Sequence, residues 1–201
     1  MKYILRAIKE GLRGLKMMLF CGRRDRFGYI ADSAVIEQPF WGAKKNIYLY
    51  EKTSIGAGAK ILATKGKFVL KSNCSVSMGL TVVCQNHTLY NRVGSYPNCS
   101  GWGEETAADV IVEEDVWIGI NVTLSPGTHI NRGCVVAAGS VCIKNREYPP
   151  YSIIGGNPAK FIKFKFSLEE QLEHERLRFA ENERIPEEVL RSDWEKFSIK
   201  K

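Results

Sequence analysis

Aliphatic or small apolar residues recur at every sixth position along the middle of this chain. The series is unbroken at Val112, Ile118, Leu124, Ile130, Val136 and Cys142. A small or β-branched residue lies two positions before each of them. A helix repeats about every 3.6 residues and a strand about every 2, so neither alone explains this period. The pattern predicts a coil of short parallel strands in which every sixth residue points into one axial core.

The same series extends toward the amino terminus with two irregularities. It begins at Ile30 and Ile36, loses register over residues 39–45, resumes at Leu49 and takes extra residues at 64–67. Three faces of six residues make one coil, so about five coils fit before residue 145. The single long interruption, residues 85–109, is polar and rich in turn residues but contains aromatic side chains. A loop of this length in a repeat protein is usually functional or disordered, and its aromatic side chains argue against plain disorder.

Helical segments are expected on both sides of the coil. Residues 2–20 carry an apolar stripe at helical spacing, formed by Ile4, Ile8, Leu12, Leu15 and Leu19. After residue 164, Ser167 and Glu170 form a capping box, and Pro186 begins a second short helix. The expected organisation is therefore a basic amphipathic helix over 1–27, a coil domain over 28–163 with the inserted loop 85–109, and a helical tail over 164–201.

The charge and the cysteines bear on partners and compartment. The net charge is +7, and residues 1–26 carry eight Lys or Arg against two acids, +6 in total, which leaves +1 for the rest of the chain. Docking on the body of the protein is the usual cause of such an amphipathic helix, and peripheral contact with an anionic membrane is the alternative. Nucleic acid is not expected as a partner. No signal peptide is visible, and Cys74, Cys134 and Cys142 occupy core positions, so a reduced, cytoplasmic protein is expected.

Four sequence blocks in order resemble the hexapeptide-repeat acyltransferases, in particular the galactoside, maltose, nodulation-type and polysaccharide acetyltransferases. They are Val116–Gly119, Ser125–Gly127, Ala137–Ser140 and Gly155–Lys160. The resemblance implies an all-β fold, a left-handed parallel β-helix, assembled as a homotrimer with sites between subunits. It also implies acetyl-CoA as co-substrate and O-acetylation of a saccharide hydroxyl, in surface polysaccharide biosynthesis. N-acetylation of an amino sugar or a serine-type acceptor, and a non-catalytic β-helix scaffold, remain alternatives.

The resemblance assigns the catalytic base to His87, which follows a predicted strand and opens the long interruption. Acyl transfer to a hydroxyl needs a base, and a neutral imidazole with a reference pKa of about 6.5 suits this task. The alternative is a histidine that only holds the loop in place. Asn86 and Glu105 are expected to contact the acceptor, and Trp117 is either a pocket wall or an interface aromatic. Three acids are candidates for orienting the imidazole: Glu104, Glu105 and Asp109.

The resemblance also implies a coenzyme A groove beside the last coils. The residues expected to form it and to meet the phosphates are Gly119, Ile120, Ala137, Ala138, Lys144, Asn157, Lys160 and Lys163. The γ-class carbonic anhydrases share this fold and hold a metal with three histidines. Here His87, His129 and His174 are far apart in sequence, so no metal is expected, and His129 and His174 are expected to face solvent.

Overall fold

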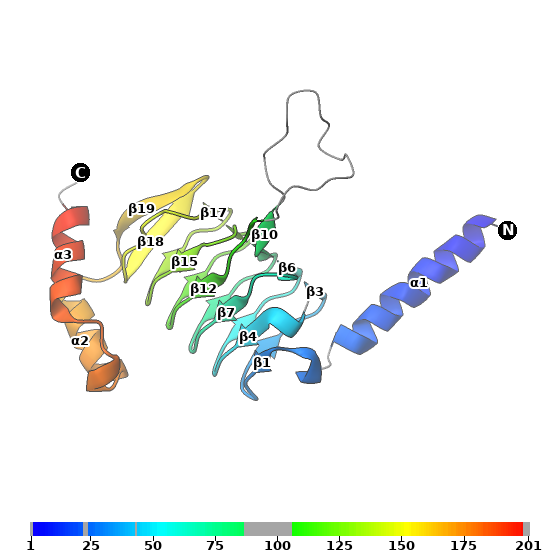
Figure 1. Cartoon of the computed structure of the whole chain (residues 1–201), viewed down its shortest axis with the longest axis horizontal. Helices are drawn as coiled ribbons and strands as arrows, with labels where there is room; N and C mark the ends of the chain where they lie inside the picture. Colours follow the sequence, from blue (N-terminus) through cyan, green and yellow to red (C-terminus); the bar gives the residue numbers. More distant parts are fainter. Residues whose placement is uncertain (1, 22–23, 43, 87–105, 199–201) are drawn as a thin grey trace, which may run out of the picture.

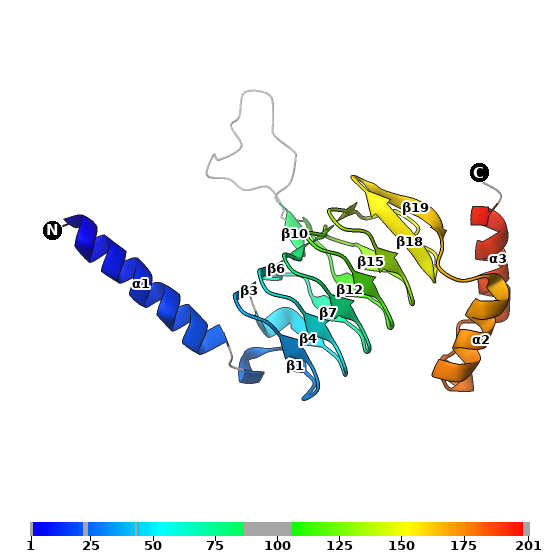
Figure 2. The same cartoon turned by 180° about the vertical axis from the view of Figure 1, so that it is seen from behind.

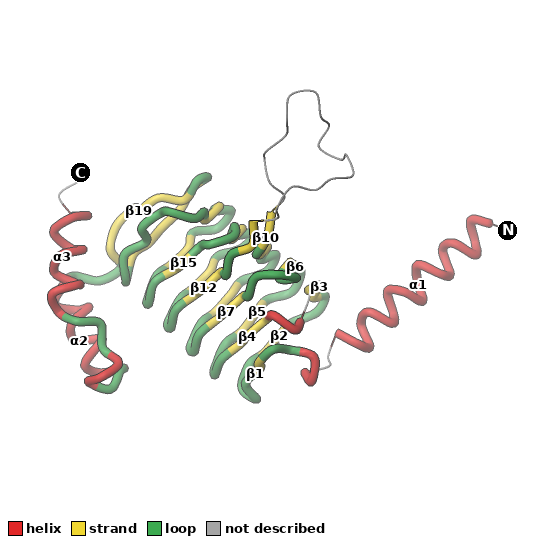
Figure 3. The backbone as a smooth tube through the Cα atoms, viewed as in Figure 1, coloured by secondary structure: helices red, strands yellow, loops and turns green. Residues whose placement is uncertain are grey.

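The computed structural model describes residues 2–21, 24–42, 44–86 and 106–198. Figure 1 shows a stack of coils between the amino-terminal helix α1 (Lys2–Cys21) and the carboxy-terminal helices α2 (Leu168–Arg178) and α3 (Glu187–Ser198). Figure 3 shows that the strands are short and that turns separate them at each corner of a coil. The chain is a left-handed parallel β-helix, as the period of six and the resemblance predict.

Three sheets form the walls of the solenoid. The first sheet contains β1 (Tyr29–Ile30), β4 (Ile47–Leu49), β7 (Phe68–Leu70), β12 (Val110–Val112) and β15 (His129–Ile130). The second contains β2 (Val35–Ile36), β5 (Ser54–Ile55), β8 (Ser75–Val76), β13 (Trp117–Ile118), β16 (Val135–Val136), β18 (Ser152–Gly156) and β19 (Ala159–Phe164). The third contains β3 (Phe40–Gly42), β6 (Ala59–Leu62), β9 (Thr81–Val83), β14 (Thr123–Leu124) and β17 (Val141–Cys142). A separate two-stranded sheet pairs β10 (Gln85–Asn86) with β11 (Thr106–Ala107).

The residues of the six-residue series, which we call rungs, form the axial core. Ile118 pairs in register with Val136, and Leu124 pairs with Cys142, so one coil separates each rung from the next on the same wall. Every rung from Leu49 to Cys142 is at most 3% exposed. Full burial of such aliphatic side chains contributes about 1.5–3 kcal/mol each, so the stacked rungs are the main source of stability of the solenoid.

The first coil is more regular than its sequence suggests. Over residues 39–45 the series loses register in the sequence, yet Phe40 is buried and Gly42 pairs with the rung Ile61. A glycine therefore occupies a rung position in this coil. The extra length is taken up by the short 3₁₀ helix η2 (Lys44–Asn46), so the third wall continues without a break.

The described apolar side chains of helix α1 (Lys2–Cys21) do not pack on the solenoid. Figures 1 and 2 show the helix extending away from the first coil, beyond the 3₁₀ helix η1 (Arg24–Arg26). Ile4, Ile8 and Leu12 of its apolar stripe are 66%, 53% and 61% exposed. The expectation that the stripe docks on the body of the protein is therefore wrong for the described part of the chain.

The two ends of the solenoid are closed by different means. At the amino-terminal end, Arg24 donates hydrogen bonds to the carbonyl oxygens of Ala31 and Ala34, the latter at 3.2 Å. At the carboxy-terminal end, β19 turns back and pairs antiparallel with β18. Helices α2 (Leu168–Arg178) and α3 (Glu187–Ser198), joined by the 3₁₀ helix η3 (Glu181–Glu183), then cover this end.

The carboxy-terminal helices begin as the sequence predicts and pack on a small second core. Ser167 and Glu170 form both hydrogen bonds of the capping box at the start of α2. Tyr151, Leu168 and Leu190 form the buried centre of this core. The helices are thus held by apolar contacts at the last coil.

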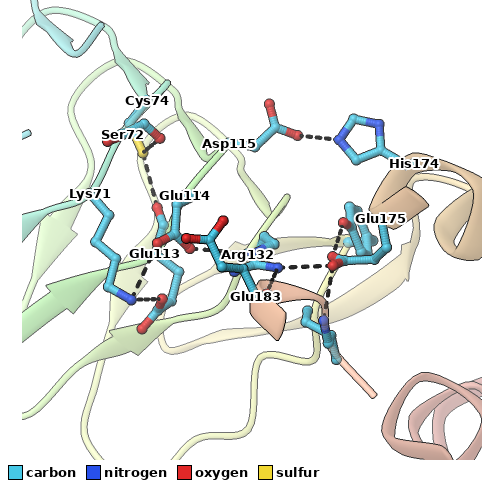
Figure 4. A network of polar contacts seen from close by, with 12 residues as sticks. Lys71, Ser72, Cys74, Glu113, Glu114, Asp115, Arg132, His174, Glu175 and Glu183 are labelled. Atoms are coloured by element: carbon cyan, nitrogen blue, oxygen red, sulfur yellow. Dashed lines mark hydrogen bonds and ion pairs between the residues drawn. The ribbon is translucent and has the colours of Figure 1, made fainter. Parts of the chain in front are cut away.

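A polar network joins α2 to the last coils (Figure 4). Arg132 Nη1 lies 2.9 Å from Glu175 Oε2, and the two side chains are only 12% and 3% exposed. Glu175 also accepts hydrogen bonds from the Tyr151 hydroxyl and, at 2.9 Å, from the backbone N–H of Ile185. This buried carboxylate is therefore satisfied by three groups from three segments of the chain.

Candidate active site

A two-stranded stem carries the long interruption out of the solenoid. β10 follows β9 after one residue, and in the β10–β11 pair Asn86 lies opposite Thr106 and Gln85 opposite Ala107. Figure 1 shows β10 projecting from the third wall. His87 follows Asn86 directly in the sequence, but residues 87–105, which include His87 and Glu105, lie outside the described residues. The stem is the described part of the candidate site that is nearest to His87 in the sequence.

The root of the stem is fixed to the preceding coil. The Ala108 N–H donates to the Cys84 carbonyl oxygen at 3.0 Å, and Asp109 Oδ1 accepts from the Lys67 N–H at 2.8 Å. A Cβ atom at Gly66 would lie 2.7 Å from the carbonyl oxygens of both Cys84 and Ala108, so only glycine permits this approach. Asp109 therefore anchors the interruption, a role that its sequence position did not reveal.

Cys84 is a buried thiol at this root. Its side chain is fully buried and its Sγ lies 3.3 Å from the Lys67 carbonyl oxygen. Burial raises the pKa of Cys84 to about 11, so the thiol stays protonated and is a poor nucleophile. Cys84 thus has a structural function beside the candidate site.

Four of the predicted coenzyme A residues, Gly119, Ile120, Ala137 and Ala138, lie at the corner between the second and third walls. We call this the alanine corner, and its exposed positions in successive coils are Met78, Ile120 and Ala138. The Gly139 N–H donates to the Ile120 carbonyl oxygen at 2.8 Å and thereby links two of these coils. A Cβ atom at Gly119 would lie 2.7 Å from the Ala138 nitrogen, so the close spacing of these coils requires glycine.

Ser140 connects the alanine corner to the turn that follows the last coil. Its hydroxyl donates to the Ala137 carbonyl oxygen at 2.6 Å and accepts from the Gly156 N–H at 3.2 Å. This turn continues through the cis Asn157–Pro158 peptide bond into β19. Ser140 is 1% exposed, so it positions the backbone of Ala137 and Gly156.

The three predicted phosphate-binding lysines are exposed and do not lie together. Lys160 pairs with Gly155, next to Ala137 at the alanine corner, whereas Lys163 pairs with Ile153 farther along β18. Lys144 lies at the opposite corner of the third wall, where its side chain covers Gly127. We call this the stem corner, because β10 leaves the third wall at the same corner.

The predicted acceptor residues Asn86 and Trp117 also lie on different walls. Asn86 belongs to the stem next to the third wall, whereas Trp117 is on the second wall, where it pairs with Ser75 and Val135. Trp117 is 55% exposed. One chain alone therefore does not bring these two side chains to one pocket.

An apolar hollow of about 450 Å³ lies beside the stem on the first coils. Its lining residues are Trp41, Gly42, Lys60, Ile61, Leu62 and Thr64. The Thr64 hydroxyl is hydrogen-bonded to the Gln85 side chain, which joins the hollow to β10. The period of six does not reveal this feature, because Trp41 and Gly42 come from the coil in which the series loses register and Lys60–Thr64 come from the next coil.

The two described histidines have structural partners. His129 is about half exposed, as expected, and its Nε2 lies 2.8 Å from Glu113 Oε1. The prediction that His174 faces solvent is wrong, since its side chain is only 23% exposed. Its ring packs edge-on against Tyr151, with 5.5 Å between the ring centres, and its Nε2 lies 3.2 Å from Asp115 Oδ2. Among residues 2–21, 24–42, 44–86 and 106–198, no three His, Cys, Asp or Glu side chains lie close enough to hold a metal together.

Comparisons with known proteins agree with this geometry. Residues 109–144 match the model of the bacterial transferase hexapeptide family (six repeats). A putative acetyltransferase of Saccharomyces cerevisiae is 30% identical over 143 residues, which cover 70% of this chain and 67% of the relative. The chain therefore belongs to the hexapeptide-repeat acyltransferase family.

Two further proteins are informative. A probable macrolide acetyltransferase of Lysinibacillus sphaericus is 37% identical over 117 residues, which cover 51% of this chain and 63% of that relative. The structure of a hexapeptide-repeat acetyltransferase of Vibrio cholerae, complexed with acetyl coenzyme A, has a TM-score of 0.63 and 26% identity, and covers 72% of this chain and 74% of that one. The chain spans about half to two thirds of the length of the first curated relatives it matches.

Proposed function

We propose that this chain is an acetyl-CoA-dependent O-acetyltransferase that uses His87 as general base and modifies a saccharide hydroxyl in surface polysaccharide biosynthesis. The observation that carries this proposal is the rooted β10–β11 stem, which ties the segment that begins at His87 to the third wall of an acyltransferase solenoid. Two further facts support acetyl-CoA as the donor: the chain's membership of the family, and the complex of the Vibrio cholerae acetyltransferase with acetyl coenzyme A.

In the proposed reaction the neutral imidazole of His87 accepts the proton of the acceptor hydroxyl. The oxygen then attacks the thioester carbonyl carbon, and a tetrahedral intermediate forms. Its oxyanion requires a fixed donor, for which a backbone N–H of a neighbouring coil is suited. When the C–S bond breaks, the coenzyme A thiolate leaves and takes up the proton from the imidazolium, so the base is regenerated.

The donor is proposed to lie along the alanine corner. Ile120, Ala138 and Gly139 are exposed there, and a Cβ atom at Gly139 would meet no other atom within 4 Å. Such a surface can admit the narrow pantetheine chain. Lys160 is the lysine next to this corner and is the first candidate for a phosphate contact, with Asn157 in the adjoining turn.

The separation of the predicted residues favours a site completed by a second subunit. Lys144 and Asn86 lie near the stem corner, whereas Ala138 and Lys160 lie at the alanine corner of the same chain. A homotrimer that places the stem corner of one subunit against the alanine corner of the next brings both sets together. The acceptor-binding roles of Asn86, Glu105 and Trp117 are proposed in this assembly.

The reaction is tested by measuring the free thiol released from acetyl-CoA in the presence of a saccharide panel. His87→Ala is expected to lower kcat by about 10²–10⁴-fold, because the hydroxyl loses its base. His129→Ala is the matched control, since His129 is an exposed histidine at an unrelated position, and its kcat should stay near the wild-type value. Near-normal turnover of His87→Ala, with the oligomer intact, would refute the assignment of the base.

A second acceptor class is favoured by one observation. The hollow beside the stem is lined mainly by apolar groups, among them Trp41 and Leu62, and the Lysinibacillus relative is a probable macrolide acetyltransferase. A bulky, partly apolar hydroxyl compound would fit such a surface better than a simple sugar. Including macrolides in the same panel separates the classes, and Leu62→Asp should raise KM for a macrolide selectively.

A further inference from the structure

Helix α1 presents an apolar stripe that the described part of the chain leaves uncovered. Ile4, Ile8, Leu12 and Leu15 recur at helical spacing and are 53% to 66% exposed. Figures 1 and 2 show that the helix extends away from the solenoid in both views. An aliphatic stripe of this length, exposed on a helix of 20 residues, requires a partner with an apolar interior.

The charge of α1 indicates what surrounds that interior. Residues 2–21 contain five Lys or Arg and one Glu, a sum of +4. The exposed residues Arg6 and Lys9 lie one or two positions from Ile4 and Ile8, a spacing that places them on the polar face of the helix, away from the stripe. The partner must therefore combine an apolar layer with a negatively charged surface.

An anionic lipid bilayer combines these two properties. A helix with an aliphatic face and a basic polar face lies in the plane of the interface, and each Lys or Arg near an anionic surface adds to the attraction. The helix does not cross the bilayer, since no described helix is long and apolar enough to do so. A second copy of α1 is a poor partner, because two helices of +4 repel one another and offer a single acid each.

We propose that α1 is an interfacial helix that holds the solenoid on an anionic membrane surface. This inference does not depend on the acetyl-transfer reaction. It predicts that the chain carries out its function next to a bilayer, with α1 parallel to the surface and about 30 Å long.

The test is co-sedimentation of the full chain with vesicles of phosphatidylcholine and phosphatidylglycerol, compared with phosphatidylcholine alone. The wild-type chain should bind the anionic vesicles at least tenfold more tightly, and added salt should weaken the binding. The double variant Ile8→Glu with Leu12→Glu should lose at least tenfold in affinity. Arg6→Glu with Lys9→Glu should lose the preference for anionic vesicles, because it reverses the charge but keeps the stripe.

Leu177→Glu with Val189→Glu is the matched control. It makes the same chemical change at two exposed positions of α2 and α3, and its vesicle binding should equal that of the wild type. Circular dichroism should show the same melting temperature for all variants, since none of the changed side chains is buried. Thiol release with a soluble acceptor should be unchanged in the α1 variants, so a failure of this proposal is distinguishable from a failure of the proposed reaction.

Three results would overturn the proposal. The first is no vesicle binding by the wild-type chain, and the second is equal loss in the Leu177 and Val189 control. The third is that the wild-type chain does not bind vesicles and forms a larger oligomer than the Ile8→Glu, Leu12→Glu variant in analytical ultracentrifugation. This would show that the stripe joins copies of the chain.

Discussion

The Arg132–Glu175 ion pair offers the sharpest test of how the carboxy-terminal helices are held. Arg132 Nη1 also donates to the Glu183 carbonyl oxygen at 2.9 Å, and the guanidinium lies 3.8 Å from the centre of the Phe179 ring. One side chain of the last coils therefore contacts α2, the turn after it and η3. Arg132→Ala removes all of these contacts at once but leaves the solenoid core unchanged.

The expected cost follows from the burial of the partner. Glu175 is 3% exposed, and without Arg132 its carboxylate keeps only the Tyr151 hydroxyl and the Ile185 N–H as hydrogen-bond donors. Removing one member of a buried ion pair typically costs about 3–5 kcal/mol, because the other charge remains buried and uncompensated. The exposed pair Arg191–Glu187 provides the control, since such pairs contribute about 0–1 kcal/mol.

Hydrogen exchange of the α2 and α3 amides measures this cost locally. Arg132→Ala should lower the protection of these amides by a factor of about 100 or more, since every 1.4 kcal/mol corresponds to about tenfold. Arg191→Ala should lower it less than tenfold. Adding Glu175→Gln to Arg132→Ala should restore part of the protection, because the amide is neutral and nearly the same size.

Two results would refute this reasoning. Equal effects of Arg132→Ala and Arg191→Ala would show that the buried pair contributes no more than a surface pair. A double variant as unprotected as Arg132→Ala alone would show that packing on Phe179, rather than the uncompensated charge, accounts for the loss.

Three further predictions concern the solenoid. Gly119→Ala should cost about 1–3 kcal/mol of stability by overpacking against Ala138, and it should weaken coenzyme A binding in calorimetry. The control Gly11→Ala, where a Cβ atom meets no atom within 4 Å, should do neither. Equal coenzyme A binding by both variants would contradict the proposed donor site at the alanine corner. Burial alone raises the pKa of Glu113, but hydrogen bonds from His129 and Lys71 lower it to about 2. The stability lost in Glu113→Gln should therefore be largest above about pH 4.5 and shrink toward pH 2. A difference in melting temperature that stays constant with pH would refute this. Native protein treated with iodoacetamide at pH 8 should retain four unmodified thiols by mass spectrometry, and rapid labelling of any of them would contradict their burial: Cys74, Cys84, Cys134 and Cys142.

The regular part of the fold could be predicted because it is local and periodic. The rungs from Val112 to Cys142 keep a strict spacing, and each is buried as predicted. The first coil was harder to predict because Gly42 occupies a rung without an apolar side chain. His174 was misjudged because two of the groups that cover it, the Tyr151 ring and the Asp115 carboxylate, come from segments distant in the sequence.

The candidate site could be predicted only in part for a similar reason. Short motifs identified Gly119 and Ala137–Ala138, whose proximity follows from the 18-residue repeat between coils. The anchoring of the stem by Asp109 depends on Lys67, 42 residues away, and no periodic signal connects the two. The separation of Lys144 from Lys160 likewise depends on which corner each one occupies.

The closed ends of the solenoid bear on whether one molecule can stack on another. The outer edge of the first or last coil presents a row of unpaired N–H or C=O groups. If that edge is uncovered, a coil of another molecule can pair with it. At one end, Arg24 donates hydrogen bonds to the carbonyl oxygens of Ala31 and Ala34. At the other end, β19 pairs antiparallel with β18 and covers its edge. The chain is thus a solenoid capped at both ends. We expect loss of either cap to allow fibres to grow by coil-to-coil addition.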